Sequence, residues 1–484
     1  MKLREILKDI DVLAAAAAMD TDCSGVCYDS RKVQPGDLFV AVKGFAADGH
    51  RFIPMALEKG AAAILCEDAP EGCDCWVRCS DSRLGLALAA RNFYRDPSSE
   101  MKIIGITGTN GKTTTAFLVK QLLEKTLGAK VGLVGSVVNM IGDEEIHTEH
   151  TTPESCDLQE LFRRMADAGC GYCVMEVSSH SIVLHRVAGV RFAVGLFTNL
   201  TQDHLDFHET MENYAEAKAL LFKNCDFACA NLDDGWYDTV MKNAESVYRF
   251  STKRHDAELA AHDIRLESDC VRFCAMEGSE LCRTKLRIPG AFSVYNALSA
   301  IACCRQLGIG LKECCEALES CRGAKGRVES VPTDGDYSIF IDYAVTPDAI
   351  ENVLSTLRQV APKRLVMLFG CGGDRDRKKR PIMGEISARL ADFVVVTSDN
   401  PRTEDPDAII AEIIPGVKKG GAPYVVIADR IKAIQYAIDN HQSGDVILLC
   451  GKGHEDYQII GHEKIHMDER EIVADYLKER AARK

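Results

Sequence analysis

The chain lacks the long apolar run that a membrane-spanning helix requires. Such a helix needs about 20 consecutive, mostly apolar residues, and the alanine run at residues 14–18 is far shorter. Acidic residues also interrupt residues 1–10, MKLREILKDI, where a signal peptide would be apolar. We therefore expect no membrane span and no secretion, and we expect the protein to work in the cytoplasm.

A zinc-type cysteine pattern and an excess of basic charge are missing as well. Most of the 21 cysteines stand alone in apolar surroundings. The close pairs are Cys73/Cys75, Cys303/Cys304 and Cys314/Cys315. None has the spacing of a structural zinc site, so we interpret the cysteines as small core residues in a reducing compartment. With 72 acidic against 58 basic residues, the net charge of −14 argues against nucleic acid as a partner.

The order of apolar segments predicts an α/β protein with three domains. A chain of 484 residues is too long for one core. Short apolar runs alternate with helical stretches, and most of them lead into polar residues at their carboxyl ends, where open α/β sheets bind ligands. The predicted strands are residues 102–107, 172–177, 194–199, 337–342, 364–369, 392–397, 424–428 and 445–450. We expect a small N-terminal α/β domain at 1–98, a central P-loop-like domain with a mainly parallel sheet at 99–330, and a Rossmann-like α/β domain at 331–484.

A glycine-rich loop, GITGTNGKTTT, joins the first of these strands to a helix. It departs from the strict P-loop spacing because an isoleucine occupies the position of the first glycine. Gly108 and Gly111 still let the backbone N–H groups face phosphate oxygens, and Lys112 can reach the terminal phosphates. Thr113 offers a hydroxyl group to Mg2+. The loop therefore predicts a site for ATP and Mg2+.

Two polar residues are predicted at the same sheet edge as this loop. Glu176 closes the strand in MEVSSH, and His204 follows the next strand in TNLTQDHLDFH. A carboxylate and a neutral imidazole at that edge suit Mg2+ held against ATP and a carboxyl group being phosphorylated. We predict both as metal ligands.

Lys218 falls on the apolar face of a predicted helix, together with Met211, Tyr214 and Leu221. Two interpretations stay open for it. Its stem can pack while the ammonium reaches water. Alternatively, burial lowers its pKa, and the neutral amine adds CO2 to become a carbamate that binds metal.

The TGTNGKTT form of the loop resembles that of the Mur ligases and the folylpolyglutamate synthetases, which phosphorylate a carboxylate to activate it. The resemblance covers nearly the whole chain and is closest to the MurE-type Mur ligases. It implies ATP-dependent addition of meso-diaminopimelate to the D-glutamate of UDP-N-acetylmuramoyl-L-alanyl-D-glutamate through an acyl phosphate, in peptidoglycan precursor synthesis. It also implies small-molecule substrates, Mg2+, a carbamate on Lys218 and a monomer.

The resemblance assigns roles to individual residues. The implied catalytic residues are Lys112, Glu176, His204, Lys218 and Arg327. The implied ATP site contains Gly108, Thr109, Asn110, Gly111, Lys112, Thr113, Thr114, Asn296, Arg327 and Asp342. The implied site for the UDP-muramoyl dipeptide contains Ser30, Gly44, Phe45, Ala46, Ala47, His150, Thr151, Thr152, Ser178 and Arg186. The implied metal ligands are Thr113, Glu176, His204 and Lys218.

The stretch SDNPRTEDPD, residues 398–407, combines a helix start with an unexplained arginine. Asp405-Pro406 reads as an N-cap followed by proline at the first helical position. Arg402 can clasp a free carboxylate bidentately while Asp399 and Asn400 take an ammonium. The distal centre of meso-diaminopimelate offers both groups, whereas lysine offers only the ammonium. With the resemblance, the implied diaminopimelate site contains Arg375, Asp399, Asn400, Pro401, Arg402, Gly451 and Glu455.

Three alternatives remain at this point. The same reaction could use L-lysine. A folylpolyglutamate synthetase shares the phosphate loop but has no UDP-binding first domain, so residues 1–98 argue against it. A relative that binds nucleotides only as a scaffold has its only support in Val345, where relatives usually have histidine, and in Leu184, where many have glutamine. The retained Lys112, Glu176, His204 and Lys218 argue against it.

Overall fold

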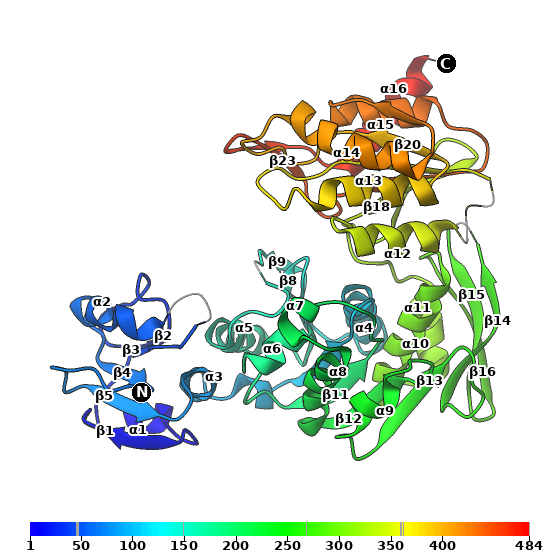
Figure 1. Ribbon diagram of the computed structural model, residues 1–484. Helices are drawn as coiled ribbons and strands as arrows, with labels where there is room; N and C mark the ends of the chain where they lie inside the picture. Colours follow the sequence, from blue (N-terminus) through cyan, green and yellow to red (C-terminus); the bar gives the residue numbers. More distant parts are fainter. Residues whose placement is uncertain (45–47, 149, 268, 359–360, 362, 484) are drawn as a thin grey trace. The chain divides into compact units, whose positions relative to one another are not determined.

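The computed structural model describes residues 1–484 except 45–47, 149, 268, 359–360, 362 and 484 (Figure 1). The chain divides into two compact units, Met1–Leu259 with Ser299–Gly310, and Ala260–Leu298 with Leu311–Lys484. The division passes through helix α10 (Ala291–Gln306). In the part of the chain that the structure describes, no helix has the length and apolar character needed to cross a membrane.

The first unit begins with a five-stranded sheet whose strand order is β1-β5-β4-β3-β2. Its strands are β1 (Val12–Ala15), β2 (Gly25–Cys27), β3 (Asp37–Val40), β4 (Ala63–Cys66) and β5 (Trp76–Cys79). Its helices are α1 (Leu3–Ile6), η1 (Gly49–Phe52), α2 (Ile53–Glu58) and α3 (Ser82–Phe93). Strands β2 to β5 pair in parallel, and only the edge strand β1 runs antiparallel. This region is the small α/β domain expected at the N-terminus.

Eight strands of a larger, eleven-stranded sheet follow in the first unit, in the order β13-β12-β11-β6-β10-β7-β8-β9. Its strands are β6 (Lys102–Thr107), β7 (Val131–Val134), β8 (Asn139–Ile141), β9 (Glu144–Ile146), β10 (Tyr172–Glu176), β11 (Phe192–Phe197), β12 (Cys225–Asn231) and β13 (Val247–Ser251). Its helical segments are η2 (Pro97–Ser99), α4 (Lys112–Leu127), α5 (Ser155–Asp167), α6 (Ser179–Val183), α7 (Leu205–His208), α8 (Met211–Ala219), η3 (Leu220–Lys223) and α9 (Tyr237–Met241). Strands β10, β6 and β11 lie side by side in parallel, so their carboxyl ends meet at one edge.

The second unit contains strands β14 to β16, of which β15 and β16 pair antiparallel, and a separate six-stranded sheet, β17-β18-β22-β19-β20-β21. Its strands are β14 (Leu259–Leu266), β15 (Val271–Glu277), β16 (Glu280–Leu286), β17 (Glu329–Val331), β18 (Tyr337–Asp342), β19 (Leu365–Phe369), β20 (Phe393–Val396), β21 (Tyr424–Val426), β22 (Asp445–Cys450), β23 (Tyr457–Ile460) and β24 (Glu463–His466). Its further helices are α11 (Leu311–Leu318), α12 (Pro347–Arg358), α13 (Lys379–Leu390), α14 (Pro406–Gly420), α15 (Arg430–Asp439) and α16 (Glu469–Arg483). In the six-stranded sheet, only β17 is antiparallel to its neighbour.

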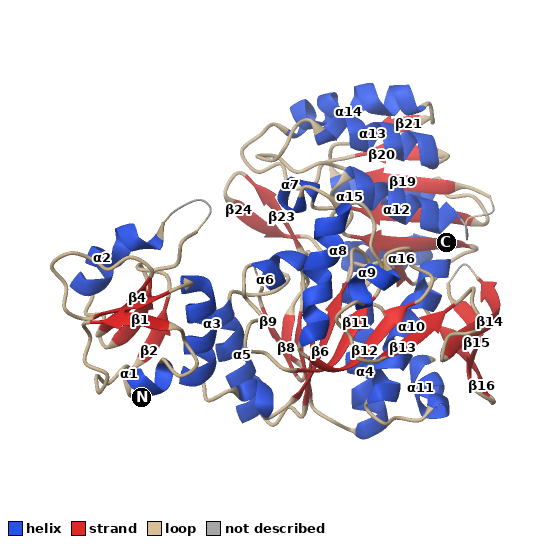
Figure 2. Cartoon of the chain, turned by 60° about the horizontal axis from the view of Figure 1, so that its bottom comes forward, coloured by secondary structure: helices blue, strands red, loops and turns tan. Residues whose placement is uncertain are grey.

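Helices cover both faces of this C-terminal sheet, as the helix and strand colours of Figure 2 show. Met367 and Leu448 point to the face packed by α12, α13 and α14. Leu368 and Leu449, one residue further along each strand, point to the face packed by α15 and α16. Strands buried on both faces are nearly continuous in apolar residues, which explains why the sequence marked them clearly. Every predicted strand is confirmed, with ends shifted by two residues at most.

A buried arginine joins two strand ends of this sheet. Arg430 and Glu469 are both without exposed side-chain surface, and Arg430 Nε donates to Glu469 Oε1 at 2.9 Å. The same guanidinium donates to the carbonyl of Ser398, just after β20, at 3.2 Å and to that of Cys450, the last residue of β22, at 2.8 Å. These strand ends carry the residues predicted to bind diaminopimelate.

Arg430→Met should destabilise the C-terminal sheet by about 3 to 5 kcal/mol, because it leaves a buried carboxylate without its cation. The measurement is the opening free energy of β20 and β22 from amide hydrogen exchange, since a chain of several domains has no single unfolding free energy. The matched control is Lys432→Met on the same helix, whose exposed side chain predicts a change of about 0.5 kcal/mol or less. Equal effects of the two substitutions would contradict the role of the buried pair.

Candidate active site

The phosphate loop lies between the end of β6 and the start of α4. Gly108 and Gly111 adopt φ angles of +147° and +83°, which side-chain-bearing residues rarely adopt. A Cβ on Gly108 would lie 1.9 Å from Thr198 Oγ1, so the neighbouring strand end leaves no room for one. The hydroxyl of Thr198 in turn donates to the carbonyl of Asn110 at 2.7 Å. The loop is thus held against the carboxyl end of β11.

Two lysines donate to the same loop carbonyl. Lys112 Nζ lies 2.9 Å from the carbonyl oxygens of both Gly108 and Thr109, and Lys218 Nζ lies 3.1 Å from that of Gly108. The Lys218 side chain is only 1% exposed and its ammonium lies 4.5 Å from the centre of the Tyr214 ring. Burial, and secondarily the charge of Lys112, holds the pKa of Lys218 well below its usual value. The ammonium does not reach water, so the interpretation of a snorkelling side chain does not hold.

Glu176, the last residue of β10, is 1% exposed and fully oriented by its neighbours. Its Oε2 accepts from the hydroxyls of Thr113 and Ser136, each at 3.1 Å, and its Oε1 accepts from the Ser136 N–H at 2.8 Å. A hydroxyl and a carboxylate in contact form a donor set that fits Mg2+, which prefers hard oxygen ligands. Ser136 was missed in the sequence because a lone serine after a short strand carries no signal.

His204 lies directly before α7 with a left-handed φ of +53°. Its side chain is 46% exposed, and its ring centre lies 4.8 Å from that of His180 and 6.1 Å from that of Tyr214. Tyr214 therefore contacts both predicted ligands, His204 and Lys218. Among the described residues, the only group of three acidic, histidine or cysteine side chains with converging ligand atoms is Glu267, Asp269 and Cys270 on another part of the chain.

The residues predicted to bind the muramoyl dipeptide gather next to Glu176. Thr151 Oγ1 lies within hydrogen-bonding distance, 3.0 Å, of the Ser136 hydroxyl, and Thr152 Oγ1 donates to the Glu176 carbonyl at 2.8 Å. The Ser178 N–H donates to Thr152 Oγ1 at 3.2 Å, and Arg186 donates to the Thr152 carbonyl at 3.1 Å. These hydroxyls therefore tie the dipeptide segment to the strand that carries the predicted metal ligand.

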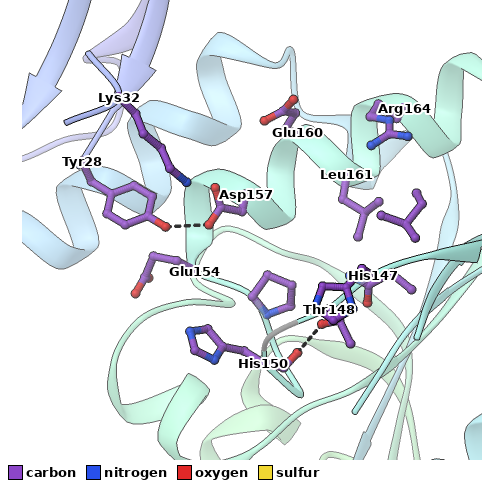
Figure 3. Close-up of a pocket in the computed structure, with 13 residues that line it drawn as sticks. Tyr28, Lys32, His147, Thr148, His150, Glu154, Asp157, Glu160, Leu161 and Arg164 are labelled. Atoms are coloured by element: carbon purple, nitrogen blue, oxygen red, sulfur yellow. Dashed lines mark hydrogen bonds between the residues drawn. The ribbon is translucent and has the colours of Figure 1, made fainter. Parts of the chain in front are cut away.

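The remaining residues of this predicted site lie closer to the N-terminal sheet. Ser30 is buried and Gly44 is described, whereas Phe45, Ala46 and Ala47 lie outside the described residues. His150 lines a cavity of about 290 Å³. Figure 3 shows Tyr28 and Lys32, which flank Ser30 in sequence, extending into this cavity toward α5, where the Tyr28 hydroxyl donates to Asp157 at 2.6 Å.

The second unit carries the other residues of the predicted ATP site. Asn296 is buried on α10, and the Arg327 guanidinium lies 5.5 Å from the centre of the Tyr343 ring. Asp342, at the end of β18, accepts from the N–H groups of Val328 and Ala344, each at 2.8 Å. Burial raises the pKa of Asp342 above its usual value. The phosphate loop belongs to the first unit, so the two groups of residues are described separately.

A cavity of about 120 Å³ opens at the carboxyl ends of β18, β19, β20 and β22. Its lining includes Arg375, Asp399, Asn400, Arg402, Gly451 and Glu455, which are the predicted diaminopimelate ligands apart from Pro401. Gly451 has a φ of +114°, and a Cβ there would lie 2.4 Å from Asp399 Oδ2. The cavity is therefore built from two strand ends that approach each other too closely for a side chain at residue 451.

Arg402 is held in a strained backbone conformation at the cavity wall. Its φ is +51°, which non-glycine residues adopt mainly where the surroundings enforce it. Its N–H donates to the Ile459 carbonyl at 3.1 Å, and its Nη1 donates to the Gly373 carbonyl at 2.8 Å. A Cβ on Gly372 would lie 3.0 Å from Nη1, so the missing side chain there makes room for the guanidinium.

A buried arginine fixes the two loops that supply the cavity. Arg380 has no exposed surface and binds Glu404 bidentately, with Nη2–Oε1 and Nη1–Oε2 distances of 2.8 and 3.0 Å. The same guanidinium donates to the Gly372 carbonyl at 3.2 Å. Its hydrogen bonds lower the pKa of Glu404 to about 2. In the sequence, Glu404 looks only like a residue of the turn before α14. The signal for its role is Arg380, whose spacing from Met383 and Ser387 places it on the same buried face of α13.

The helix start predicted at Asp405-Pro406 is confirmed. The Asp405 carboxylate accepts from the N–H groups of Asp407 and Ala408, and Pro406 is the first residue of α14. Val345, the departure from the histidine of relatives, lines the cavity, and its carbonyl accepts from Lys379 Nζ at 2.9 Å. A lysine thus reaches the wall at the place where the histidine is missing.

Three segments of the chain match known protein families. Residues 22–78 match the Mur ligase family, catalytic domain; residues 106–304 match the Mur ligase middle domain; and residues 326–453 match the Mur ligase, glutamate ligase domain. These matches span both units and carry the phosphate loop and most of the residues that line the C-terminal cavity.

Several full-length relatives carry one name, UDP-N-acetylmuramoyl-L-alanyl-D-glutamate--2,6-diaminopimelate ligase. That of Clostridium botulinum is 47% identical over 459 residues, covering 93% of this chain and 94% of the relative. That of Caldanaerobacter subterraneus is 48% identical over 463 residues, covering 95% and 96%. A solved structure under the same name aligns over 99% of both chains with a TM-score of 0.75 and 31% identity. The MurF ligase of Thermotoga maritima in complex with ADP shares the fold at 19% identity, with a TM-score of 0.61 over 96% of this chain and 100% of that one.

Proposed function

This chain belongs to the Mur ligase family, and we propose that it joins meso-diaminopimelate to the D-glutamate of UDP-N-acetylmuramoyl-L-alanyl-D-glutamate at the expense of ATP. The reaction is a step of peptidoglycan precursor synthesis. The observation that carries the proposal is the C-terminal cavity, where arginines and acids suited to a free amino acid meet at converging strand ends. Its relatives at 47% and 48% identity bear the name of this ligase.

The charges of the cavity favour diaminopimelate over lysine. Arg375 and Arg402 supply guanidinium groups for the distal carboxylate, and Asp399 and Glu455 supply carboxylates for the distal ammonium. Lysine presents only the ammonium, which would leave two cations at the wall without an anion. We therefore propose diaminopimelate, and not L-lysine, as the amino acid substrate.

The chemistry that we propose proceeds in two steps. The glutamate side-chain carboxylate attacks the terminal phosphorus of ATP, which forms an acyl phosphate and releases ADP. The amine of diaminopimelate then attacks the acyl carbon, loses a proton, and expels phosphate from the tetrahedral intermediate. Lys112 and Arg327 neutralise the charge of the phosphates, and Asn296 and Asp342 hold the nucleoside.

Mg2+ has suitable residues beside the phosphate loop. When bound there, Mg2+ supplies positive charge to the phosphate oxygens during phosphoryl transfer. Thr113 and Glu176 offer adjoining oxygen ligands, and we propose His204 as a further ligand. Ser136 holds the Glu176 carboxylate in place through two hydrogen bonds.

We propose a carbamate on Lys218 as well. Its support is the burial of the side chain beside the phosphate loop and the resemblance of its motif to that of the MurE-type ligases. Addition of CO2 to the neutral amine forms an N–C bond and releases one proton, so a buried neutral amine becomes a carboxylate.

We also propose that the protein acts as a cytoplasmic monomer. All residues proposed for binding and catalysis lie in one chain, so none has to come from a second copy. All 21 cysteines are thiols and not disulfides, which suits a reducing compartment.

The purified protein should form ADP from radiolabelled ATP only when the muramoyl dipeptide and diaminopimelate are both present. The dependence follows because the dipeptide supplies the carboxylate and the amino acid discharges the acyl phosphate. Chromatography should show a product of the combined mass. ADP formation that is independent of both substrates would reject the ligase function.

Arg402→Ala should raise the KM for diaminopimelate by roughly 10 to 100-fold, because a charged hydrogen-bonding partner of the distal carboxylate is lost. The preference for diaminopimelate over L-lysine should disappear in competition assays. Arg389→Ala, at an exposed arginine that pairs with Glu351 on α12, serves as the control and should leave both quantities unchanged. If the selectivity of Arg402→Ala is unchanged, residues 398–407 form only a turn and a helix cap and do not select the substrate.

Lys218→Ala should lower kcat by roughly 100-fold or more, as expected when a charge-stabilising group at the reacting phosphate is removed. Native mass spectrometry of the wild type should show one added CO2, which is lost in this variant. Removing bicarbonate should slow the wild type, whereas the control Lys223→Ala, at an exposed lysine, should behave like the wild type. If neither CO2 nor bicarbonate has an effect, Lys218 is not carbamylated.

A further inference from the structure

Lys452 is a buried lysine to which the proposed reaction assigns no role. It follows β22 directly after Gly451, and its side chain has no exposed surface. Burying an ammonium is costly unless it is paired and hydrogen-bonded. Its surroundings therefore show what it contacts and what those contacts hold in place.

The ammonium of Lys452 binds two residues of the cavity wall. Its Nζ lies 2.6 Å from Asn400 Oδ1 and 2.8 Å from Glu455 Oε2. The Asn400 Nδ2 donates to the same Glu455 oxygen at 2.9 Å. The three side chains form a closed triangle of hydrogen bonds, and the Tyr457 ring, 5.4 Å from Nζ, covers the ammonium.

This triangle determines which way the Asn400 amide points. Its Oδ1 receives hydrogen bonds from the Lys452 ammonium and, at 2.9 Å, from the Ile459 N–H. Neither of these groups can accept a hydrogen bond, so the amide oxygen must face them. The opposite orientation would place an NH2 group against an N–H group and a buried cation, and would leave the Ile459 N–H without its acceptor.

The fixed orientation leaves two atoms for a ligand. Within the described part of the chain, one Nδ2 hydrogen of Asn400 and the Oε1 atom of Glu455 have no protein partner. Both residues line the cavity, and the Glu455 side chain is 12% exposed. Asn400 can thus only donate to a ligand, and Glu455 can only accept.

We infer that Lys452 is a positioning residue for the amino acid substrate: it presents Asn400 as a donor to the distal carboxylate and Glu455 as an acceptor for the distal ammonium. This inference rests on the proposed function. It changes the role expected from the sequence, in which Asn400 accepted the ammonium together with Asp399. Asn400 instead stands with Arg402 on the side of the carboxylate, and Asp399 with Glu455 on that of the ammonium.

The test compares Lys452→Met with the wild type in steady-state assays of all three substrates. Methionine keeps the length of the buried side chain and removes the ammonium, so Asn400 is free to flip and Glu455 loses its anchor. We expect the KM for diaminopimelate to rise roughly 10 to 100-fold, with the KM values for ATP and the muramoyl dipeptide nearly unchanged. The control is Lys464→Met, whose exposed ammonium lies 4.2 Å from the centre of the same Tyr457 ring and which should match the wild type.

A double-mutant cycle with Glu455→Gln separates positioning from a general structural role. Because Lys452 acts partly through Glu455, Lys452→Met should raise the KM for diaminopimelate by a smaller factor in the Glu455→Gln background than in the wild type. An equal factor in both backgrounds would overturn the inference. So would an equal rise in the KM values of all three substrates.

Two further outcomes keep the test decisive. If Lys452→Met does not fold alone, Glu455→Gln is compared with the double variant, in which the buried ion pair is removed as a unit. A further rise in the KM for diaminopimelate then supports positioning of Asn400, and no rise overturns it. If the wild type does not ligate diaminopimelate at all, the proposed function itself is rejected. The variants test only the role of Lys452.

Discussion

The amino acid cavity depends on a buried guanidinium that ties together the ends of two strands. Arg430 donates to the last carbonyl of β22 and to the carbonyl of Ser398 just after β20, while Glu469 balances its charge. Parallel strands bring their carboxyl ends to one edge, but they do not by themselves fix the loops that follow. Arg430 does this for the segments that begin at Ser398 and Gly451. Arg380 has a similar role. Its hydrogen bonds to the Gly372 carbonyl and the Glu404 carboxylate join the loop after β19 to the segment that contains Arg402. The loops that line the cavity are therefore held by two buried arginines that are not themselves among its lining residues.

The phosphate loop is held in a different way, because single groups in and beside it form hydrogen bonds with several side chains. The Gly108 carbonyl accepts from both Lys112 and Lys218, and the absent side chain of Gly108 lets Thr198 approach the loop. Glu176 receives Thr113 and Ser136, and Ser136 also contacts the dipeptide segment at Thr151. The predicted metal ligand, the phosphate loop and the dipeptide segment are thereby linked within one hydrogen-bonded group. Such linkage is what a phosphoryl transfer between two bound substrates needs, because its rate depends on their relative placement.

Much of the fold could be predicted, because its signals lie within short segments of the sequence. Strands buried on both faces are marked by continuous apolar runs, and Asp405-Pro406 marks a helix start through its own backbone chemistry. Lys218 was predicted on a buried face because it falls in step with the apolar residues of α8. Residue roles that depend on distant partners were not accessible in this way. Glu404 looked like one more turn residue, since the Arg380 that binds it comes from another helix, and Ser136 carried no signal until it was found against Glu176.

Asn400 shows the difference between what the sequence determines and what the tertiary structure determines. The sequence alone determined the fold class, the strands and the phosphate loop, because periodicity, glycine placement and helix caps are short-range properties of a chain. Its resemblance to the MurE-type ligases then named the residues that gather at the strand ends. Only the tertiary structure decided which way the Asn400 amide faces, because that depends on the Lys452 ammonium and the Ile459 N–H, each more than fifty residues away in the chain. Whether an amide donates or accepts follows from the donors packed against it, and a sequence does not state which atoms will be packed together.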